Sequence, residues 1–421
     1  MSEPTESAPN SVIDSATRFL RTEAGGGFAL LVGAFAALIW VNLIDADSYS
    51  SVWSTDVRIG IGDASITETL GHWVNDGLMT LFFFLITLEI KRELVTGDLR
   101  EPKAAALPII AALGGVLVPI AIFLALAVGE IDAKGWGIPM ATDAAFAIAV
   151  LAILGDRVGI GVRLFLVTLA VVDDVAAIGV IAVAYVGEIS IGWLALAAAG
   201  LCVVTLMRVL GVSRILLFVP IGLLVWFATL ESGIHATLAG VALALLTPAR
   251  PVKGRKVLEE LEGGLHPYVS FLILPLFALA NAGVELGGSS LSNAEGQRVA
   301  LAVAAGLVVG KFVGIAGATL LALRLRLGSP PNGVDTRGLL GAAALAGIGF
   351  TVSLFITPLA YPDAPLLEGA KIGILGASVV AAIFGIAILA PGGKHPTREE
   401  ATDSAESRSS GHREQRSPPH H

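Results

Sequence analysis

The chain has 421 residues, of which 55% are hydrophobic and only 15% are charged, and its formal net charge is −8. A soluble domain carries roughly 25% charged residues, so this composition excludes an ordinary soluble protein. The negative net charge argues against nucleic acid as a partner. The single cysteine, Cys202, excludes an internal disulfide, and we expect it in the core of an apolar block.

Apolar residues recur in blocks of about 20, which is the length needed to cross about 30 Å of hydrocarbon. Membrane strands would instead alternate in segments of about ten residues. The sequence therefore predicts an all-α integral membrane protein with membrane lipid around it. Residues 1–24 form a polar N-terminus, and the first apolar block is too long for a signal peptide. We expect twelve transmembrane helices within residues 25–391, at 25–45, 70–90, 104–128, 135–154, 162–186, 190–210, 214–230, 233–247, 267–285, 298–323, 337–358 and 367–391.

The connections between these spans differ in their content of Lys and Arg: connections rich in these residues alternate along the chain with connections that have few of them. By the positive-inside rule, both termini are expected in the cytoplasm, which fits a bacterial inner membrane. The polar segment 46–68 is expected to form a hairpin at the membrane surface, and a homodimer through this hairpin is a hypothesis. The polar tail, residues 392–421, is expected to be disordered.

Four charged residues fall inside predicted spans: Asp143, Asp173, Asp174 and Lys311. Each charge at the centre of a membrane helix costs about 2.5–3.5 kcal/mol on the insertion scale. Pairing among themselves is the structural alternative, but one lysine cannot neutralise three aspartates. The excess acids therefore predict a site for a proton or a metal ion.

Two spans carry signals of an interrupted helix. Pro139 lies in mid-span, and proline removes a backbone donor and clashes with the preceding turn, so we expect a break there. A new half-helix would begin at Thr142 and Asp143, whose charge would offset its positive end. Gly347 and Gly349 weaken the eleventh span in a comparable way. Broken helices in corresponding positions point to inverted-topology repeats with a midplane site, here spans 3–5 and 10–12 with spans 4 and 11 broken and crossing.

Seven motifs in order resemble the NhaA-type sodium/proton antiporter family. They cover about residues 20–390 and read LEIKREL, ATDAAFA, VVDDVAAI, GIHATLAGV, LHPYVSFLILPLFALANAGV, GLVVGKFVGI and GIGFTVSLFI. The resemblance implies twelve helices and electrogenic exchange of sodium for protons. It makes Asp174 the main cation-binding carboxylate and Asp173 its partner, the latter paired with Lys311. Asp143 and Thr142 would lie where the broken helices cross.

The resemblance also implies a cytoplasmic entrance at which the family senses pH, assigned here to Glu89, Arg92, Glu93, Glu262, His266 and His235. The first three also suit an ordinary salt-bridge cluster on one helix face. His266 could simply begin span 9, and His235 is as well explained by a structural role as by a pH response. Some members have histidine where Gly263 stands, and many have glycine where Thr87 stands.

Adjacent helix residues lie about 100° apart, so one aspartate can face Lys311 while the other faces a cavity. Sodium prefers oxygen ligands, and burial disfavours a charged carboxylate, so a proton and a sodium ion (or lithium) would compete at Asp174 and Asp173. Two protonatable groups permit two protons per sodium. We expect no cofactor and no enzyme activity. A passive channel suits the acids but not Lys311, and an intramembrane aspartyl protease would need its two acids on separate helices.

Overall fold

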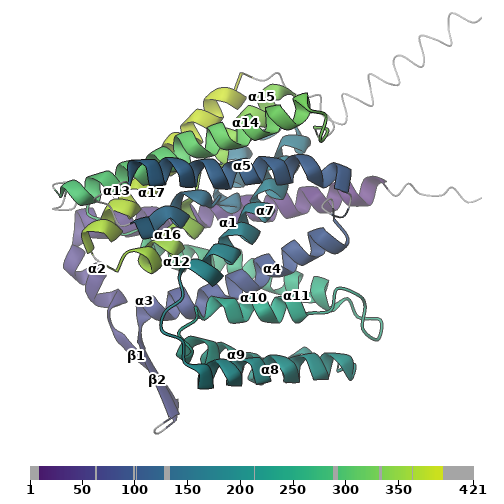
Figure 1. The fold of residues 1–421 in the computed structure, drawn as a ribbon, viewed down its shortest axis with the longest axis vertical. Helices are drawn as coiled ribbons and strands as arrows, with labels where there is room; N and C mark the ends of the chain where they lie inside the picture. Colours follow the sequence, from purple (N-terminus) through teal and green to yellow (C-terminus); the bar gives the residue numbers. More distant parts are fainter. Residues whose placement is uncertain are drawn as a thin grey trace, which may run out of the picture.

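The computed structural model describes residues 9–61, 64–97, 100, 102–127, 133–212, 214–287, 293–330, 334–362 and 364–391. The predicted tail over 392–421 lies outside these residues, as do the first eight residues of the polar N-terminus. Helices make up almost all of this part of the chain, together with one two-stranded antiparallel sheet (Figure 1). The prediction of a largely helical protein is therefore confirmed.

The first half of the chain contains these elements: α1 (Pro9–Ile39), η1 (Trp40–Ile44), α2 (Ala46–Trp53), β1 (Asp56–Ile61), β2 (Ala64–Thr69), α3 (Leu70–His72), η2 (Trp73–Leu78), α4 (Met79–Val95), α5 (Pro102–Leu126), η4 (Ala133–Met140), α6 (Ala144–Leu154), η5 (Gly155–Arg157), α7 (Ile160–Ala184) and α8 (Ile191–Val209). The second half contains η6 (Ile215–Leu217), α9 (Val219–Glu231), α10 (Thr237–Leu246), α11 (Val257–Tyr268), η7 (Val269–Ile273), α12 (Leu274–Asn281), α13 (Ala294–Ala305), η9 (Gly306–Gly310), α14 (Lys311–Arg324), α15 (Thr336–Leu345), α16 (Phe350–Ala360) and α17 (Ala364–Leu389). Here η1, η2, η7 and η9 are π-helical turns, and η4, η5 and η6 are 3-10 helices.

Among the described residues, nine helical segments are long and apolar enough to cross a membrane. They are Ala24–Ile44, Ala105–Leu126, Ala133–Leu154, Ile160–Ala184, Ile191–Val209, Val257–Asn281, Ala294–Arg324, Thr336–Ala360 and Ala364–Leu389. The other three predicted spans also fall on helices, but two of these, Ile215–Glu231 and Thr237–Leu246, are shorter. The total of twelve crossings therefore stays a prediction.

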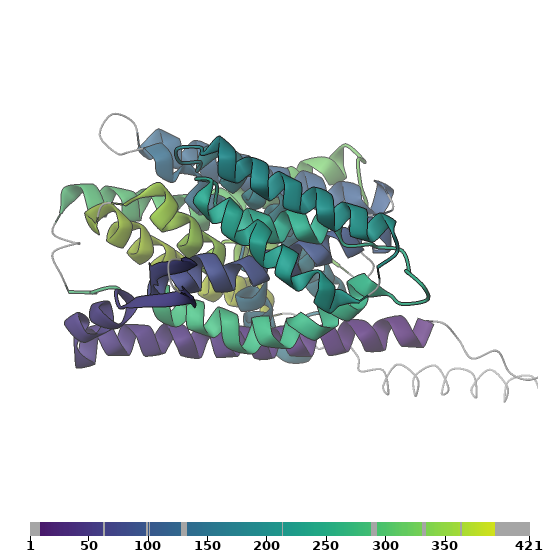
Figure 2. The same ribbon diagram turned by 90° about the horizontal axis from the view of Figure 1, so that it is seen from below.

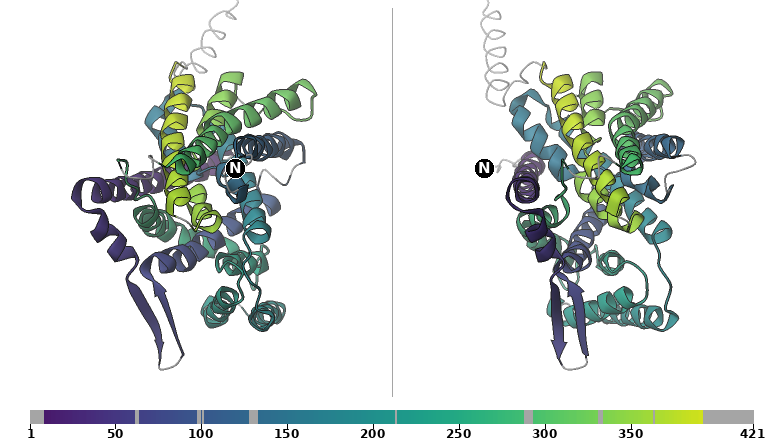
Figure 3. Two further views of the ribbon diagram at one scale, coloured as in Figure 1. Left: turned by 60° about the vertical axis from the view of Figure 1, so that its left-hand side comes forward. Right: turned by 90° about the vertical axis from the view of Figure 1, so that its left-hand side faces the viewer.

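The predicted hairpin over 46–68 is only partly correct. Strands β1 and β2 pair from Asp56 with Thr69 to Ile61 with Ala64, and the hairpin extends beyond the helices (Figure 3). Residues 46–53, however, form the helix α2. Its start is fixed by Asp45, whose carboxylate accepts hydrogen bonds from the backbone N–H groups of residues 47 and 48. Such an N-cap satisfies donors that the first helical turn leaves free.

The long helices pack in pairs that join distant parts of the sequence. Helix α5 packs against α14, α13 packs against α17, and α1 runs along one edge of the body against α6 and α12 (Figure 2). At the α5–α14 contact, a Cβ on Gly114 would lie 2.2 Å from the carbonyl oxygen of Gly314, and one on Gly314 would lie 2.1 Å from that of Gly114. Only glycine permits this reciprocal approach. Cys202, expected in the core, is instead exposed on α8, because only one side of this helix packs against other helices.

We expected the helix to break at Pro139, but it does not end there. Pro139 lies inside η4, and the non-helical residues are 141–143. The proline ring packs against η9, where a Cβ on Gly306 would lie 2.6 Å from the Cβ of Pro139. The interruption therefore follows two residues later, where Asp143 caps the next helix.

Candidate ion site at two interrupted helices

The two interruptions lie against each other. The first separates η4 from α6 at residues 141–143, and the second separates α15 from α16 at residues 346–349. The backbone N–H of Asp143 donates to the carbonyl of Ile348 at 2.6 Å. The Oγ1 of Thr142 lies 2.9 Å from the carbonyl oxygen of Ala346. Polar backbone groups freed by each interruption are thus satisfied by the other, which is what a buried site in an apolar protein requires.

Asp143 caps both half-helices that begin at the interruptions. One carboxylate oxygen accepts from the N–H of Phe146 in α6 at 2.9 Å, and the other accepts from the N–H of Thr351 in α16 at 3.0 Å. The side chain is 3% exposed. A carboxylate at a helix N-terminus offsets the partial positive charge there. The sequence predicted this role for α6, but it gave no indication that the same residue also caps α16.

Asp173 and Lys311 form a fully buried ion pair. The Nζ of Lys311, at the start of α14, lies 2.5 Å from Oδ2 of Asp173 in α7, and both side chains have no exposed surface. The hydroxyl of Thr142 lies 2.6 Å from the same oxygen. A threonine hydroxyl has one proton, so at any one moment it donates either to Asp173 or to the carbonyl of Ala346, but not to both. The resemblance implied the pair with the lysine but not this shared proton.

Asp174 differs from its neighbour in burial and in partners. It is half-buried, whereas Asp173 is fully buried. Among the described residues, Asp174 has no hydrogen bond or ion pair, although the charges of Asp173, Asp143 and Lys311 act on it. The rotation of about 100° between adjacent helix residues thus gives the two acids different surroundings. Asp174 keeps its oxygens available for a ligand.

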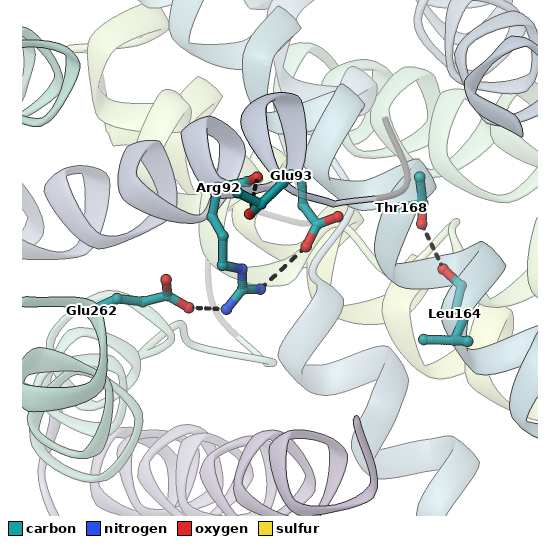
Figure 4. Close-up of polar contacts among 6 residues, drawn as sticks. Arg92, Glu93, Leu164, Thr168 and Glu262 are labelled. Carbon is teal, nitrogen blue, oxygen red and sulfur yellow. Dashed lines mark hydrogen bonds and ion pairs between the residues drawn. The ribbon is translucent and has the colours of Figure 1, made fainter. Parts of the chain in front are cut away.

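The residues assigned to a cytoplasmic entrance form a separate cluster. The guanidinium of Arg92 forms ion pairs with Glu262 and with Glu93, the second at 3.2 Å (Figure 4). Glu89 adds its charge on the same helix. His266 lies one helical turn from Glu262 on α11, and both are buried. All five residues are thus linked through their charges, because those of Glu89, Glu93 and Glu262 act on Arg92 and that of His266 acts on Glu262.

His235 does not belong to this cluster. It precedes α10 and lies by the backbone of Tyr185, at the end of α7. Lys91, the neighbour of Arg92, donates instead to the carbonyls of Leu245 and Thr247 at the opposite end of α10. A helix of this length spans roughly 15 Å, so it separates His235 from the entrance. Sequence order gave no indication of this distance.

Two further polar contacts at the interruptions were not predicted. The hydroxyl of Ser353 in α16 donates to the carbonyl of Ile138 in η4 at 2.7 Å, and Ser353 is fully buried. The hydroxyl of Thr357 donates to the carbonyl of Ser353 at 2.8 Å. The available signal was the presence of three hydroxyl residues, Thr351, Ser353 and Thr357, in an otherwise apolar half-helix.

The arrangement suits a small hard cation or a proton. Within the described residues, no group of three or more His, Cys, Asp and Glu side chains is placed to hold a metal ion. The aspartates of α7, with the hydroxyl and carbonyl oxygens of the interruptions, are oxygen atoms of the kind that sodium prefers as ligands. Such an ion would be cargo, because one half-buried carboxylate does not form a closed cage.

Comparison with known proteins gives consistent matches over nearly the whole chain. The profile of the family described as Na+/H+ antiporter 1 matches residues 17–389. Na(+)/H(+) antiporter NhaA 2 of Erythrobacter litoralis is 42% identical over 386 residues, which cover 91% of this chain and 96% of that protein. Na(+)/H(+) antiporter NhaA of Acidovorax sp. is 45% identical over 377 residues, covering 88% and 90%. The protein of that name from Koribacter versatilis is 41% identical over 437 residues, covering 94% and 96%.

Proposed function

Because the chain belongs to the Na+/H+ antiporter 1 family, and is therefore a multi-pass membrane transporter that exchanges sodium for protons, we propose that Asp174 is the carboxylate at which the two ions compete. The observation that carries this proposal is the different status of two adjacent acids. Lys311 neutralises Asp173 inside the protein, whereas Asp174 is half-buried and has no partner among the described residues. Asp143 is held at the N-termini of two half-helices, so Asp174 is the acid that remains available for an ion.

Competition at one carboxylate produces exchange. Partial burial disfavours the bare charged form of Asp174, so the site is occupied either by a proton or by a sodium ion. A site that reorients only when occupied then carries sodium in one direction and protons in the other. Asp173 and the interruptions contribute further oxygen ligands for sodium, with lithium as an alternative cargo. No cofactor is needed for this cycle.

The exchange is electrogenic in this proposal, with two protons per sodium ion. Asp174 supplies one protonatable group, and the Asp173–Lys311 pair supplies the second, because it can take up a proton when its ionic bond opens. Net charge would then move in each cycle, so that the membrane potential drives sodium out of the cell. The protein would lie in a bacterial inner membrane, with both termini cytoplasmic.

The fold in this proposal has twelve transmembrane helices and two inverted repeats, α5–α7 and α13–α17. Each repeat has a long helix, an interrupted helix and a second long helix, in that order. The reciprocal contact of Gly114 and Gly314 supports this, because it joins the first helices of the two repeats at one point. Such repeats allow alternating access around a midplane site.

The cluster around Arg92 and Glu262 is proposed as the pH-responsive entrance on the cytoplasmic side. Its members form ion pairs or lie close enough for their charges to interact. Protonation of one member therefore changes the electrostatic potential at the others. The hairpin of β1 and β2 is proposed as the contact of a homodimer, because it extends beyond the helices and its outer strand edges pair with no other strand of the described ranges.

The test is sodium-dependent proton movement in proteoliposomes that contain equal amounts of wild type and Asp174→Asn. Asparagine keeps the side-chain volume but cannot take up a proton at this position and is a weaker sodium ligand, so we expect exchange to be lost while the protein still inserts. Exchange near the wild-type rate in Asp174→Asn would contradict the site. A sodium current in the wild type that is not coupled to proton movement would instead indicate a passive channel.

A further inference from the structure

The second interruption has a buried hydroxyl in its vicinity that no protein group satisfies. Ser378 in α17 is 1% exposed, and its Oγ has no hydrogen-bond partner among the described residues. Hydroxyl residues in helices commonly donate to the carbonyl four residues earlier, as Thr87 does to Phe83 at 2.7 Å. Ser378 does not do so. A buried hydroxyl without a partner is costly, and in a native structure this indicates a ligand, often water.

The face of α17 that carries Ser378 is placed by its contacts with α15. A Cβ on Gly341 would lie 2.4 Å from Leu389, and one on Gly385 would lie 2.4 Å from Leu345. These pairs show that the two helices run antiparallel, so that lower numbers in α17 meet higher numbers in α15. Further along the same line, Ala381 lies 3.1 Å from the position of a Cβ on Gly347.

Ser378 is the next residue on this line. Residues three and four positions apart share a helix face, so Ser378 lies one turn beyond Ala381 and faces the chain just after Gly347. This is the second interruption. The carbonyl oxygen of Leu307 lies nearby, at the level of Ala381, because it is 2.7 Å from the position of a Cβ on Gly347, where Ala381 also packs. Leu307 belongs to the π-helical turn η9, which directly precedes Lys311.

The first half of the chain has a comparable arrangement. Asp173 lies about halfway along α7 and contacts the first interruption through Thr142. Ser378 lies about halfway along α17, the helix in the same position of the second repeat, and faces the second interruption. The second half therefore has a neutral hydroxyl where the first half has a carboxylate.

We propose that Ser378 binds a water molecule at the second interruption, between its hydroxyl and the carbonyl of Leu307. This water is the counterpart in the second repeat of the contact between Thr142 and Asp173, and it holds the turn from which Lys311 reaches Asp173. Ser378 is a positioning residue, because it acts on the ion site through η9 and Lys311. This inference rests on the proposed ion site.

The test compares two variants that each remove one buried hydroxyl. Ser378→Ala should raise the sodium KM about fivefold, as expected for loss of one neutral hydrogen bond, with a maximal rate close to that of wild type. The matched control is Thr319→Val, because Thr319 in α14 is also 1% exposed and its hydroxyl also has no hydrogen-bond partner in the part of the chain that the structure describes. It lies two turns from Lys311 toward the other end of its helix, so its KM should not change.

A cryo-EM map of the wild type that resolves ordered water gives a second measurement, which does not depend on transport. It should show a water within hydrogen-bond distance of Ser378 Oγ. A sodium KM for Ser378→Ala equal to that of Thr319→Val overturns the proposal, and so does a map without this water. Failure of the ion site is distinguishable, because Asp174→Asn would then exchange like wild type whatever Ser378→Ala does.

Discussion

The ammonium group of Lys311 lies 2.5 Å from the carboxylate of Asp173, and neither side chain has any exposed surface. The two residues are 138 positions apart in the chain. A buried pair of this kind is costly to break, because the remaining charge is left without water and without a partner. The pair therefore holds α7 against α14 next to the interruptions, and it leaves Asp174, without a partner among the described residues, as the acid proposed to exchange ions.

Lys311→Gln should lower the melting temperature in detergent, because removing one partner of a buried ion pair costs about 3–5 kcal/mol. The double variant Lys311→Gln with Asp173→Asn leaves no buried charge at this point and should recover much of the loss. Thermal unfolding of the two variants and of Asp173→Asn gives the coupling between the residues. Equal melting of Lys311→Gln and wild type would mean that the pair does not stabilise the fold.

Thr142→Val should weaken sodium binding and lower stability by about 1–3 kcal/mol, the cost of leaving buried acceptors without a donor. Valine has nearly the same shape, so the effect comes from the hydroxyl that lies near Asp173 and Ala346. Thr142→Ser keeps the hydroxyl and serves as the control. Sodium KM and melting temperature are measured for both, and a serine variant as impaired as the valine variant would argue against the hydroxyl.

Loss of a single N-cap costs about 0.5–2 kcal/mol. Asp143→Ala should destabilise the protein by more than this, because the one carboxylate caps both α6 and α16. Asp143→Asn retains one acceptor oxygen and should fall between the alanine variant and wild type. The melting temperatures of the three proteins give this order directly. If asparagine and alanine melt together, the second cap does not contribute.

Tyr49→Phe should lower stability by about 1–3 kcal/mol with exchange retained. The buried hydroxyl of Tyr49 lies 2.9 Å and 2.7 Å from the carbonyls of Leu279 and Ala280, and it accepts from the N–H of Gly283 at 3.2 Å. These contacts fix the end of α12 and involve none of the aspartates. Tyr268→Phe is the matched control, because Tyr268 is 65% exposed, and it should melt like wild type.

The sequence alone determined the helical membrane class, and it identified the charged residues of the proposed ion site. Apolar blocks of the right length leave no other fold class, and four charged residues in such blocks stand out because each is costly there. The sequence also predicted the position of the first interruption to within a few residues, because Thr142 and Asp143 form a recognisable helix start. These are local properties, and they depend on residues close together in the chain.

Only the tertiary structure decided which groups meet. The second cap made by Asp143, the contact of Ser353 with η4, and the separation of His235 from Arg92 depend on how distant helices pack. Adjacent acids in one helix have the same local pattern; the family resemblance implied that Asp173 is the paired one, and the physical reason is the place of α14, which brings Lys311 to it. Side-chain partners across helices are set by packing over more than a hundred residues, and the local pattern of one helix does not specify them.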